Sequence, residues 1–223
     1  MNLEEFQEEI GYKFKNINLL QTALTHTSYA NENKKESNEK LEFLGDAILE
    51  FIVSNYLFRN YHQLKEGTMT KVRATVVCEK SLYQVALKYN FGDMLYLGKS
   101  EKKSGGNQKA AILADSVEAV IAAIYEDGGL NQAEKFILNN LKVAIEQESK
   151  NAGEKDYKTV LQEELQKNGS VDIKYVIISE KGPDHDKSFI AEVRLNDKCL
   201  ARGVGKTKKE AEMQAAKQAL ENI

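Results

Sequence analysis

The chain has 223 residues, of which 42% are hydrophobic, and this length is enough for two modest domains with their own cores. Acids interrupt the longest apolar stretches and the first residues carry no basic cluster, so we expect no membrane span, no leader and a cytoplasmic protein. The formal net charge of −3 excludes a generally basic surface, so contact with a nucleic acid would have to be local. The two cysteines, Cys78 and Cys199, stand alone and predict neither a disulfide framework nor a zinc site.

Helical periodicity runs through the first part of the chain, with short loops and no proline. The sequence predicts helices over 3–10, 19–25, 39–61, 68–77, 78–89, 110–125 and from 131 or 132 to 147. Residues 98–108 are rich in Gly, Lys and Ser and are predicted to form a loop. We therefore expect residues 1–147 to form an all-helical domain.

The pattern changes after residue 147. Residues 148–153 are polar and lose the helical period, which is typical of a linker. Pro183, the only proline, is expected in a turn between two strands. The remaining residues, 154–223, predict a helix over 157–167, strands over 174–180, 188–195 and 198–203, and a helix over 207–220. The expected fold class is an all-α domain followed by a small α+β domain of order α-β-β-β-α.

Two of the predicted helices carry acids among apolar residues. Glu39, Glu42 and Asp46 share one face of the first, because residues three or four apart lie side by side on a helix. Asp115 and Glu118 form a second acidic stripe, in a helix that is apolar nearly all round and must be mostly buried. A buried carboxylate without a partner is costly, and neither stripe has a Lys or Arg one turn away along it. We therefore expect a metal cation to join the two stripes.

The chemistry of these ligands predicts which ion binds. Oxygen ligands from two packed helices suit a hard, octahedral ion, Mg²⁺ or, as a substitute, Mn²⁺. Such an ion keeps several waters, and a metal-bound water is a nucleophile near neutral pH. The plainer alternative is a pair of ordinary amphipathic helices whose acids face solvent, although the apolar flanks leave little polar face. The histidines His26 and His62 have no cysteine or serine partner at a recognisable spacing, so no nucleophilic triad is predicted.

Two separated segments carry a resemblance to a known family. Residues 38–47, Asn-Glu-Lys-Leu-Glu-Phe-Leu-Gly-Asp-Ala, closely resemble the signature of bacterial ribonuclease III. Residues 113–125, Leu-Ala-Asp-Ser-Val-Glu-Ala-Val-Ile-Ala-Ala-Ile-Tyr, look like the second catalytic segment of that family. Shorter matches at residues 23–29 and 103–106 stand in the same order. The resemblance extends to essentially the whole chain through the pattern of the C-terminal domain.

The resemblance implies a Mg²⁺-dependent endonuclease that cuts double-stranded RNA to 5′-phosphate and 3′-hydroxyl ends with short 3′ overhangs, in the processing of ribosomal RNA and mRNA. It implies that Glu42, Asp46, Asp115 and Glu118 hold the metal, with Asp46 and Glu118 as the catalytic residues. Glu39 belongs to the signature, but its role stays open between organising RNA and a second metal. Bacterial members act as homodimers, and the apolar signature helix is the surface we expect a second copy to cover.

The C-terminal element order resembles the double-stranded-RNA-binding domain. In that domain the first helix and the turn after the first strand enter two successive minor grooves, and the start of the last helix meets the phosphates between them, so that shape rather than base sequence is read. Lysines at a helix N-terminus oppose the helix dipole, which favours a phosphate ligand at that position. The RNA-binding residues that the resemblance implies are Gln162, Glu163, His185, Lys206, Lys208 and Lys209.

Two other functions compete with this interpretation. The first is a non-catalytic regulator that binds double-stranded RNA and has kept the fold, which the loss of any one of the four acids would have favoured. The second is a metal-dependent nuclease for another helical nucleic acid, such as an RNA–DNA hybrid. An RNA-binding domain that needs 2′-hydroxyls on both strands argues against the second.

Overall fold

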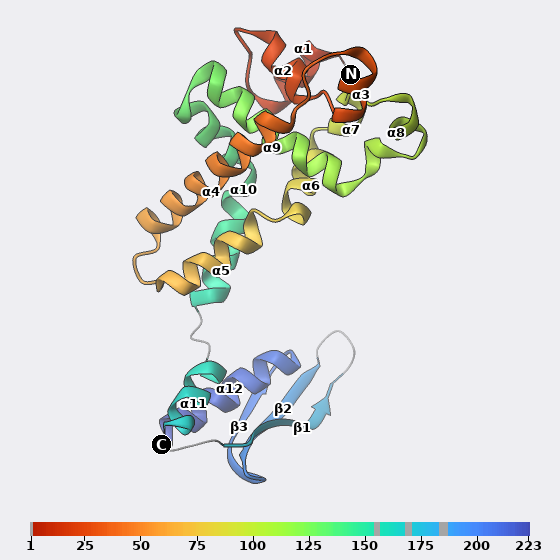
Figure 1. Cartoon of the computed structure of the whole chain (residues 1–223). Helices are drawn as coiled ribbons and strands as arrows, with labels where there is room; N and C mark the ends of the chain where they lie inside the picture. Colours follow the sequence, from red (N-terminus) through yellow and green to blue (C-terminus); the bar gives the residue numbers. More distant parts are fainter. Residues whose placement is uncertain (1, 154–156, 168–170, 183–186) are drawn as a thin grey trace. The chain divides into compact units, whose positions relative to one another are not determined.

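The structure is a computed structural model that describes residues 2–153, 157–167, 171–182 and 187–223. Contacts within the chain divide it into a helical unit, Met1–Gly153, and a C-terminal unit, Glu154–Ile223 (Figure 1). Each unit has its own hydrophobic core. We describe the two units separately.

The helical unit is built around one apolar helix, α9 (Ala110–Gly128), which packs against α2, α4, α6, α7 and α10 (Figure 1). Nearly every residue of α9 from Leu113 to Ile124 is buried, as its apolar sequence predicts. The helices before it are α1 (Leu3–Ile10), α2 (Ile17–Ala23), α3 (Thr27–Asn33), α4 (Glu39–Asn60), α5 (Glu66–Val76), α6 (Glu79–Lys88), α7 (Phe91–Met94) and α8 (Lys99–Lys103). A short 3-10 turn, Gly106–Gln108, precedes α9, and α10 (Leu130–Gly153) follows it.

Local capping explains where several helices begin and end. Asn2 and Glu5 form a capping box at the start of α1, and α1 ends at Gly11, whose φ of 71° lies in the left-handed region. The side chain of Asn16 caps α2 by accepting a hydrogen bond from the Asn18 N–H. The carboxylate of Asp127, in the last turn of α9, accepts hydrogen bonds from the Tyr12 hydroxyl (2.7 Å) and from two backbone N–H groups of the loop before α2. The loop between α1 and α2 is therefore fastened to the end of α9.

The helical unit differs from the sequence prediction in four segments, apart from shifts of a few residues at helix ends. α3 and α7 are short helices that the periodicity did not indicate, and the predicted loop over 98–108 contains α8 and the 3-10 turn. Residues 148–153, predicted to be a linker, continue α10 as helix to Gly153. The correction has a physical cause: Ser149 is buried and Ala152 packs against the core, so the polar end of α10 keeps one face on the helical unit.

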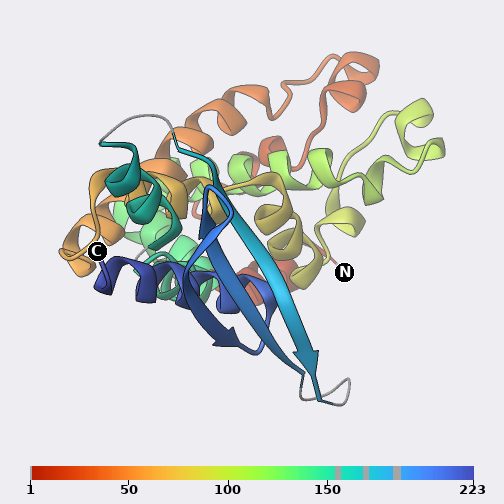
Figure 2. The same ribbon diagram turned by 90° about the horizontal axis from the view of Figure 1, so that it is seen from below.

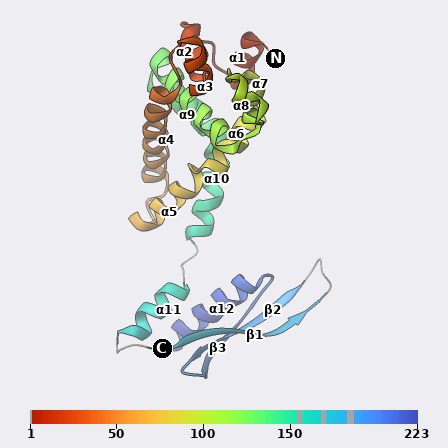
Figure 3. The ribbon, with the colours of Figure 1, turned by 45° about the vertical axis from the view of Figure 1, so that its right-hand side comes forward.

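The C-terminal unit has the predicted order of helix, three strands and helix. It consists of α11 (Tyr157–Gln166), β1 (Ile173–Lys181), β2 (Ser188–Leu195), β3 (Lys198–Gly205) and α12 (Lys208–Glu221). The strands form an antiparallel sheet in the order β1-β2-β3, and both helices lie on one face of it (Figures 2 and 3). The fold class expected from the sequence, an all-α unit and then a small α+β unit, is confirmed.

Small residues bring α12 close to the sheet. A Cβ atom on Gly203 would lie 2.1 Å from the backbone N of Ala215, and one on Gly205 would lie 2.5 Å from the backbone N of Ala211. Alanines form the buried face of α12 opposite these glycines. The packing of helix on strand is therefore nearly backbone on backbone, which sets where α12 begins relative to β3. None of the described helices combines the length and the apolar character that a membrane crossing needs.

Candidate metal centre and nucleic-acid interface

The two helices that carry the acids, α4 and α9, meet at Gly45. A Cβ atom on this residue would lie only 1.9 Å from the backbone carbonyl oxygen of Glu118, a distance that real side chains do not reach. Glycine in a helix interior costs about 0.5–1 kcal/mol relative to alanine, so its presence here needs a packing reason. The reason is the close approach of the helix backbones, which turns the acidic face of α4 toward that of α9.

This approach brings three of the predicted ligands together. Glu42 from α4 and Asp115 and Glu118 from α9 each offer an oxygen, and these oxygens all lie within 4.8 Å of one another. All three side chains are half-buried. No lysine or arginine in the described part of the chain forms an ion pair with any of them. Within the described part of the chain, the negative charge of the cluster is therefore not balanced by an ion pair.

The pKa values show that burial and the neighbouring acids disfavour the ionised form of the three carboxyl groups. Burial, reinforced by Asp46, Asp115 and Glu42, raises the pKa of Glu118 to about 8. Burial is also the main cause that raises the pKa of Glu42 and that of Asp115. With a pKa of about 8, the Glu118 carboxyl group is mostly protonated near neutral pH, and a positive charge in the site would favour its ionised form.

A buried acid in the other unit makes the contrast clear. Glu192 on β2 is only 4% exposed, yet its carboxylate accepts hydrogen bonds from Arg194 (2.7 Å) and from Arg202 (2.9 Å). These two partners hold the pKa of Glu192 below its usual value. This acid is compensated by protein side chains, whereas the acids between α4 and α9 are not. The oxygen-only donor set of that cluster fits a hard divalent cation.

The remaining acids of the signature lie at the edge of this cluster. Asp46 is exposed and is not among the three that share the 4.8 Å grouping, although its charge is the second largest cause of the raised pKa of Glu118. Glu39 is exposed and accepts a hydrogen bond from the Ser37 hydroxyl (2.9 Å). The alternative of solvent-facing acids thus describes Glu39 and Asp46, but not the other three.

Two contributors to the site were not singled out from the sequence. The sequence analysis includes Gly45 in the signature but assigns it no role. A glycine inside an apolar helix is itself a signal of close packing. Glu79, the first residue of α6, lies near enough to Asp115 for its charge to raise the pKa of that acid. Nothing in the sequence around Glu79 indicates this, because α6 and α9 meet only in the tertiary structure.

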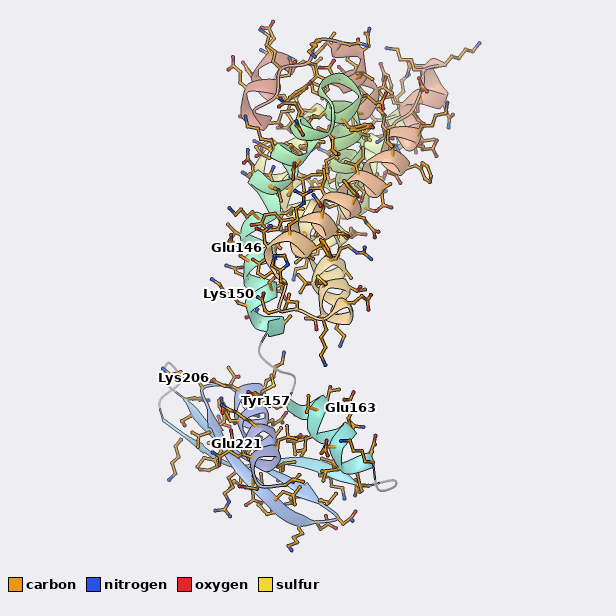
Figure 4. All side chains as sticks on the ribbon, turned by 90° about the vertical axis from the view of Figure 1, so that its left-hand side faces the viewer. Glu146, Lys150, Tyr157, Glu163, Lys206 and Glu221 are labelled. Atoms are coloured by element: carbon orange, nitrogen blue, oxygen red, sulfur yellow. The ribbon has the colours of Figure 1, made fainter. Side chains whose placement is uncertain are left out.

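The predicted RNA-binding residues lie on two separate parts of the C-terminal unit. Gln162 and Glu163 are exposed on α11, and Lys208 and Lys209 are exposed in the first turn of α12. Lys206 lies just before α12, and in the view of Figure 4 it and Glu163 are at opposite ends of the unit. The turn that contains His185 falls outside the described residues.

The start of α12 is organised by a cap. The Thr207 side chain accepts from the Glu210 N–H (3.1 Å), and the Glu210 carboxylate accepts from the Lys206 N–H (2.8 Å). The helix therefore begins at Lys208, one residue later than predicted, and Lys208 and Lys209 are exposed in its first turn.

Comparisons with known proteins agree with this arrangement. Residues 16–145 match the ribonuclease-III-like family, and residues 157–223 match the double-stranded RNA binding motif. The chain is 46% identical over 224 residues to Ribonuclease 3 of Clostridium tetani, with 100% of this chain and 95% of the relative covered. It is 48% identical over 223 residues to Ribonuclease 3 of Carboxydothermus hydrogenoformans, with 99% and 95% covered.

A solved structure supports the helical unit in particular. The nuclease domain of ribonuclease III from Campylobacter jejuni superposes with a TM-score of 0.61 and 39% identity, over 64% of this chain and 98% of that one. That structure is described as flexible in a region involved in dimer formation. Two family matches in series, relatives of almost the same length and an acidic centre at the helix contact agree with one another. The chain therefore belongs to the ribonuclease III family and is an endoribonuclease that acts on double-stranded RNA.

Proposed function

We propose that cleavage depends on Mg²⁺, with Mn²⁺ as a substitute, held by Glu42, Asp115 and Glu118, with Asp46 completing the site from its exposed position. The observation that carries this proposal is the grouping of three half-buried carboxylates within 4.8 Å with no cationic side chain paired to them among the described residues. When bound, the ion supplies a nucleophilic water and stabilises charge on the phosphoryl oxygens. Asp46 and Glu118 are the residues we propose as indispensable, and Glu39 is the peripheral member.

The packing of α4 on α9 and the apolar surroundings of Glu118 both prepare the site for a cation. The contact at Gly45 holds the acids of α4 and α9 at a set separation, so that little reorganisation is needed when a cation and a phosphate arrive. The buried apolar neighbours of Glu118 lower the local dielectric, which strengthens its interaction with a cation. We propose products with 5′-phosphate and 3′-hydroxyl ends and short 3′ overhangs, because two staggered cuts across a minor groove leave such ends.

A direct assay tests the metal requirement. The protein is incubated with a long perfect RNA duplex in Mg²⁺, in Mn²⁺ and in excess EDTA. We expect short fragments with either metal, none with EDTA, and recovery when Mg²⁺ is added back. Duplex binding without cleavage under all three conditions would favour the non-catalytic regulator. Equal cleavage of an RNA–DNA hybrid would favour the alternative of a metal-dependent nuclease that acts on another helical nucleic acid.

We also propose that the enzyme is a homodimer joined through α4. Phe43, Phe51 and Phe58 lie along one stripe of this helix and are 81%, 54% and 70% exposed. Exposed aromatic residues in a row mark an interaction surface, and a two-fold contact lets one patch cover its own copy. Each helical unit contributes one acidic cluster, so a dimer supplies the two sites that cutting both strands requires.

The dimer has a measurable consequence. Phe51→Glu with Phe58→Glu should shift the protein from dimer to monomer in sedimentation at micromolar concentration, because burying two carboxylates in an apolar interface is costly. Val143→Glu is the matched control, since Val143 is 65% exposed on α10, away from the stripe, and this variant should remain a dimer. We expect the monomer to make no paired cuts. A wild-type monomer that nicks single strands independently would contradict the proposal.

The start of α12 is proposed to hold RNA phosphates. Changing Lys208 and Lys209 together to Ala should weaken duplex binding and reduce the slope of log affinity against log salt by roughly 0.7–0.9 for each phosphate that is no longer neutralised. The control is Lys198→Ala, which changes an exposed lysine at the first residue of β3 and should change neither quantity. Cleavage by the double variant should survive at low salt and high Mg²⁺. An unchanged salt slope would show that these lysines are ordinary solvated residues.

The proposed RNA-binding set also includes Gln162 and Glu163 on α11, Lys206, and His185, which lies outside the described residues. We propose that the natural substrates are ribosomal RNA precursors and structured mRNAs, which implies work in the cytoplasm. Metal-dependent cleavage of such precursors in a cell extract, absent when Glu118 is replaced, is the measurement that checks this assignment.

A further inference from the structure

One face of the three-stranded sheet in the C-terminal unit has no role in the function described so far. Both helices lie on the same side of the sheet, and no described part of this unit covers the other side, which we call the open face (Figures 2 and 3). Ala191 and Val193 of β2 are fully buried in clusters with alanines of α12. Ile190, Glu192 and Arg194 alternate with them along the strand and therefore belong to the open face.

A row of apolar side chains crosses the open face. Val204 of β3 pairs directly with Ile190 of β2 and is 58% exposed. On the other side of Ile190, β1 has a bulge at Ile178, beside the Ser179 that pairs with Ile190, and Ile178 is 40% exposed. Single apolar residues are normal on a protein surface, whereas a contiguous group marks an interaction site. We call Ile178, Ile190 and Val204 the apolar strip.

Two arginines stand beside the apolar strip, held by one buried acid. Arg202, two residues before Val204 on β3, contacts Oε1 of Glu192 through Nε (2.9 Å) and Nη2 (2.8 Å). Arg194 donates from Nε (3.0 Å) and Nη2 (2.7 Å) to Oε2 of the same acid. A guanidinium has five N–H donors, and the Nη1 groups of this arginine pair have no hydrogen-bond partner among the described residues. The side chain of Arg202 is 67% exposed.

Stability alone does not explain why Glu192 is buried under the arginine pair. The desolvation of a buried ion pair often cancels its attraction, and apolar residues of similar size are frequently as stable. The acid does, however, fix both guanidinium groups, which reduces the entropy that they lose on binding an anion. Because a guanidinium holds a carboxylate through two parallel hydrogen bonds, the open face presents a prepared carboxylate site next to apolar surface.

We propose that the open face is a docking surface for a partner protein that sets an acidic side chain on the arginine pair and apolar side chains on the apolar strip. RNA suits this face less well, because a phosphate backbone has no apolar groups to cover the strip. A second copy is also disfavoured, because a two-fold contact through this face would bring arginines against arginines. The charge and the apolar strip together therefore select an acidic, amphipathic protein segment.

The position of the open face leaves it accessible while RNA is bound. The proposed RNA-binding residues of α11 and of the start of α12 belong to the helices, on the opposite side of the sheet (Figure 3). The assignment of RNA to that side is part of the function proposed above. Peptide binding is measured without RNA, so the docking surface and the RNA interface can fail separately.

A displayed library of random short peptides tests the docking surface without knowledge of the natural partner. The library is selected on the full-length protein in EDTA, with excess soluble Val204→Glu variant to remove peptides that bind elsewhere. Val204 is exposed, so this variant should fold, while its new carboxylate repels an acidic ligand. We expect the selected sequences to be enriched in Asp or Glu beside Leu, Ile or Phe.

Titration of the selected peptides measures the contribution of each part of the surface. Val204→Glu should weaken their binding about 10-fold or more, because like charges across an interface are costly. Arg202→Lys keeps the charge but loses the two-pronged geometry, and it should weaken binding to a smaller extent. The matched control is Val143→Glu, the same change at a residue of α10 that is 65% exposed, and it should bind the peptides as the wild type does.

Three results would overturn the proposal. Competition between duplex RNA and the peptides, or weaker RNA binding by Val204→Glu, would place the open face in the RNA interface. A changed oligomeric state of Val204→Glu in sedimentation would assign the face to a second copy of the chain. A selection without acidic enrichment, or without any peptide that is sensitive to Val204→Glu, would show that the strip and the arginine pair only stabilise the sheet.

Discussion

Glu118→Gln should abolish cleavage while leaving duplex affinity almost unchanged. The amide keeps the volume and hydrogen-bonding capacity of the side chain but removes its negative charge from the centre formed with Glu42 and Asp115. A bound cation contributes several kcal/mol to phosphoryl transfer, so we expect a loss of at least ~10³-fold in kcat. The measurement is single-turnover cleavage of a short duplex in Mg²⁺, alongside equilibrium binding to the same RNA.

The matched control for this substitution is on the same helix. Glu126→Gln makes the same chemical change at an exposed position near the end of α9, outside the acidic cluster, and should cleave at the wild-type rate. If Glu118→Gln retained near-normal turnover in Mg²⁺, the metal assignment would be wrong. If both variants lost activity, the effect would belong to the charge of α9 rather than to the site.

The same substitution has a consequence for stability in the metal-free protein. The pKa of Glu118 is raised from 4.5 to about 8 in the fold, so the folded state holds a proton that the unfolded state has lost. The resulting cost is absent below pH 4.5, grows as pH rises, and is fully present above about 8. Urea unfolding in EDTA should show Glu118→Gln more stable than wild type by ~1–2 kcal/mol at alkaline pH, after allowance for partial exposure, with no gain in acid.

Gly45→Ala should damage both the fold and the reaction, because the new Cβ would lie 1.9 Å from the backbone carbonyl oxygen of Glu118. Backbone atoms cannot rotate away as a side chain does, so α4 and α9 have to move apart. Overpacking of this kind typically costs about 1–3 kcal/mol. A displacement of about 1 Å at a catalytic group can reduce the rate about 10²-fold, and this is the loss we expect in cleavage by the folded variant.

Gly67→Ala controls for the helix propensity of the substitution. Gly67 lies in the first turn of α5, and a Cβ atom there meets nothing within 4 Å. Alanine should therefore leave activity unchanged and hold or slightly raise the urea midpoint, since it favours a helix over glycine. Normal cleavage by folded Gly45→Ala would show that the close approach is not what positions the acids.

Much of this protein can be read directly from its residues. The apolar run of α9 predicts a buried helix whatever surrounds it, because so few polar positions remain to face water. The spacing of Glu39, Glu42 and Asp46 puts three acids on one helix face, since the helical period is a local property. The period-2 strands and the capped final helix likewise follow from local patterns. Together with the resemblance of residues 38–47 to the ribonuclease III signature, these features indicate the family and a metal-dependent cleavage of RNA.

Other features depend on which segments meet in the folded chain. Residues 148–153 look like a linker in isolation but continue α10, because Ser149 and Ala152 find a core to pack against. The sequence treats Asp46 and Glu42 alike, whereas the packing angle of α4 on α9 half-buries Glu42 and leaves Asp46 exposed. Gly45 packs against the backbone of Glu118, and the Ser28 hydroxyl accepts a hydrogen bond from the Gly98 N–H, so both have partners far along the chain. Local periodicity carries no information about such contacts, because they arise only when separate helices pack together.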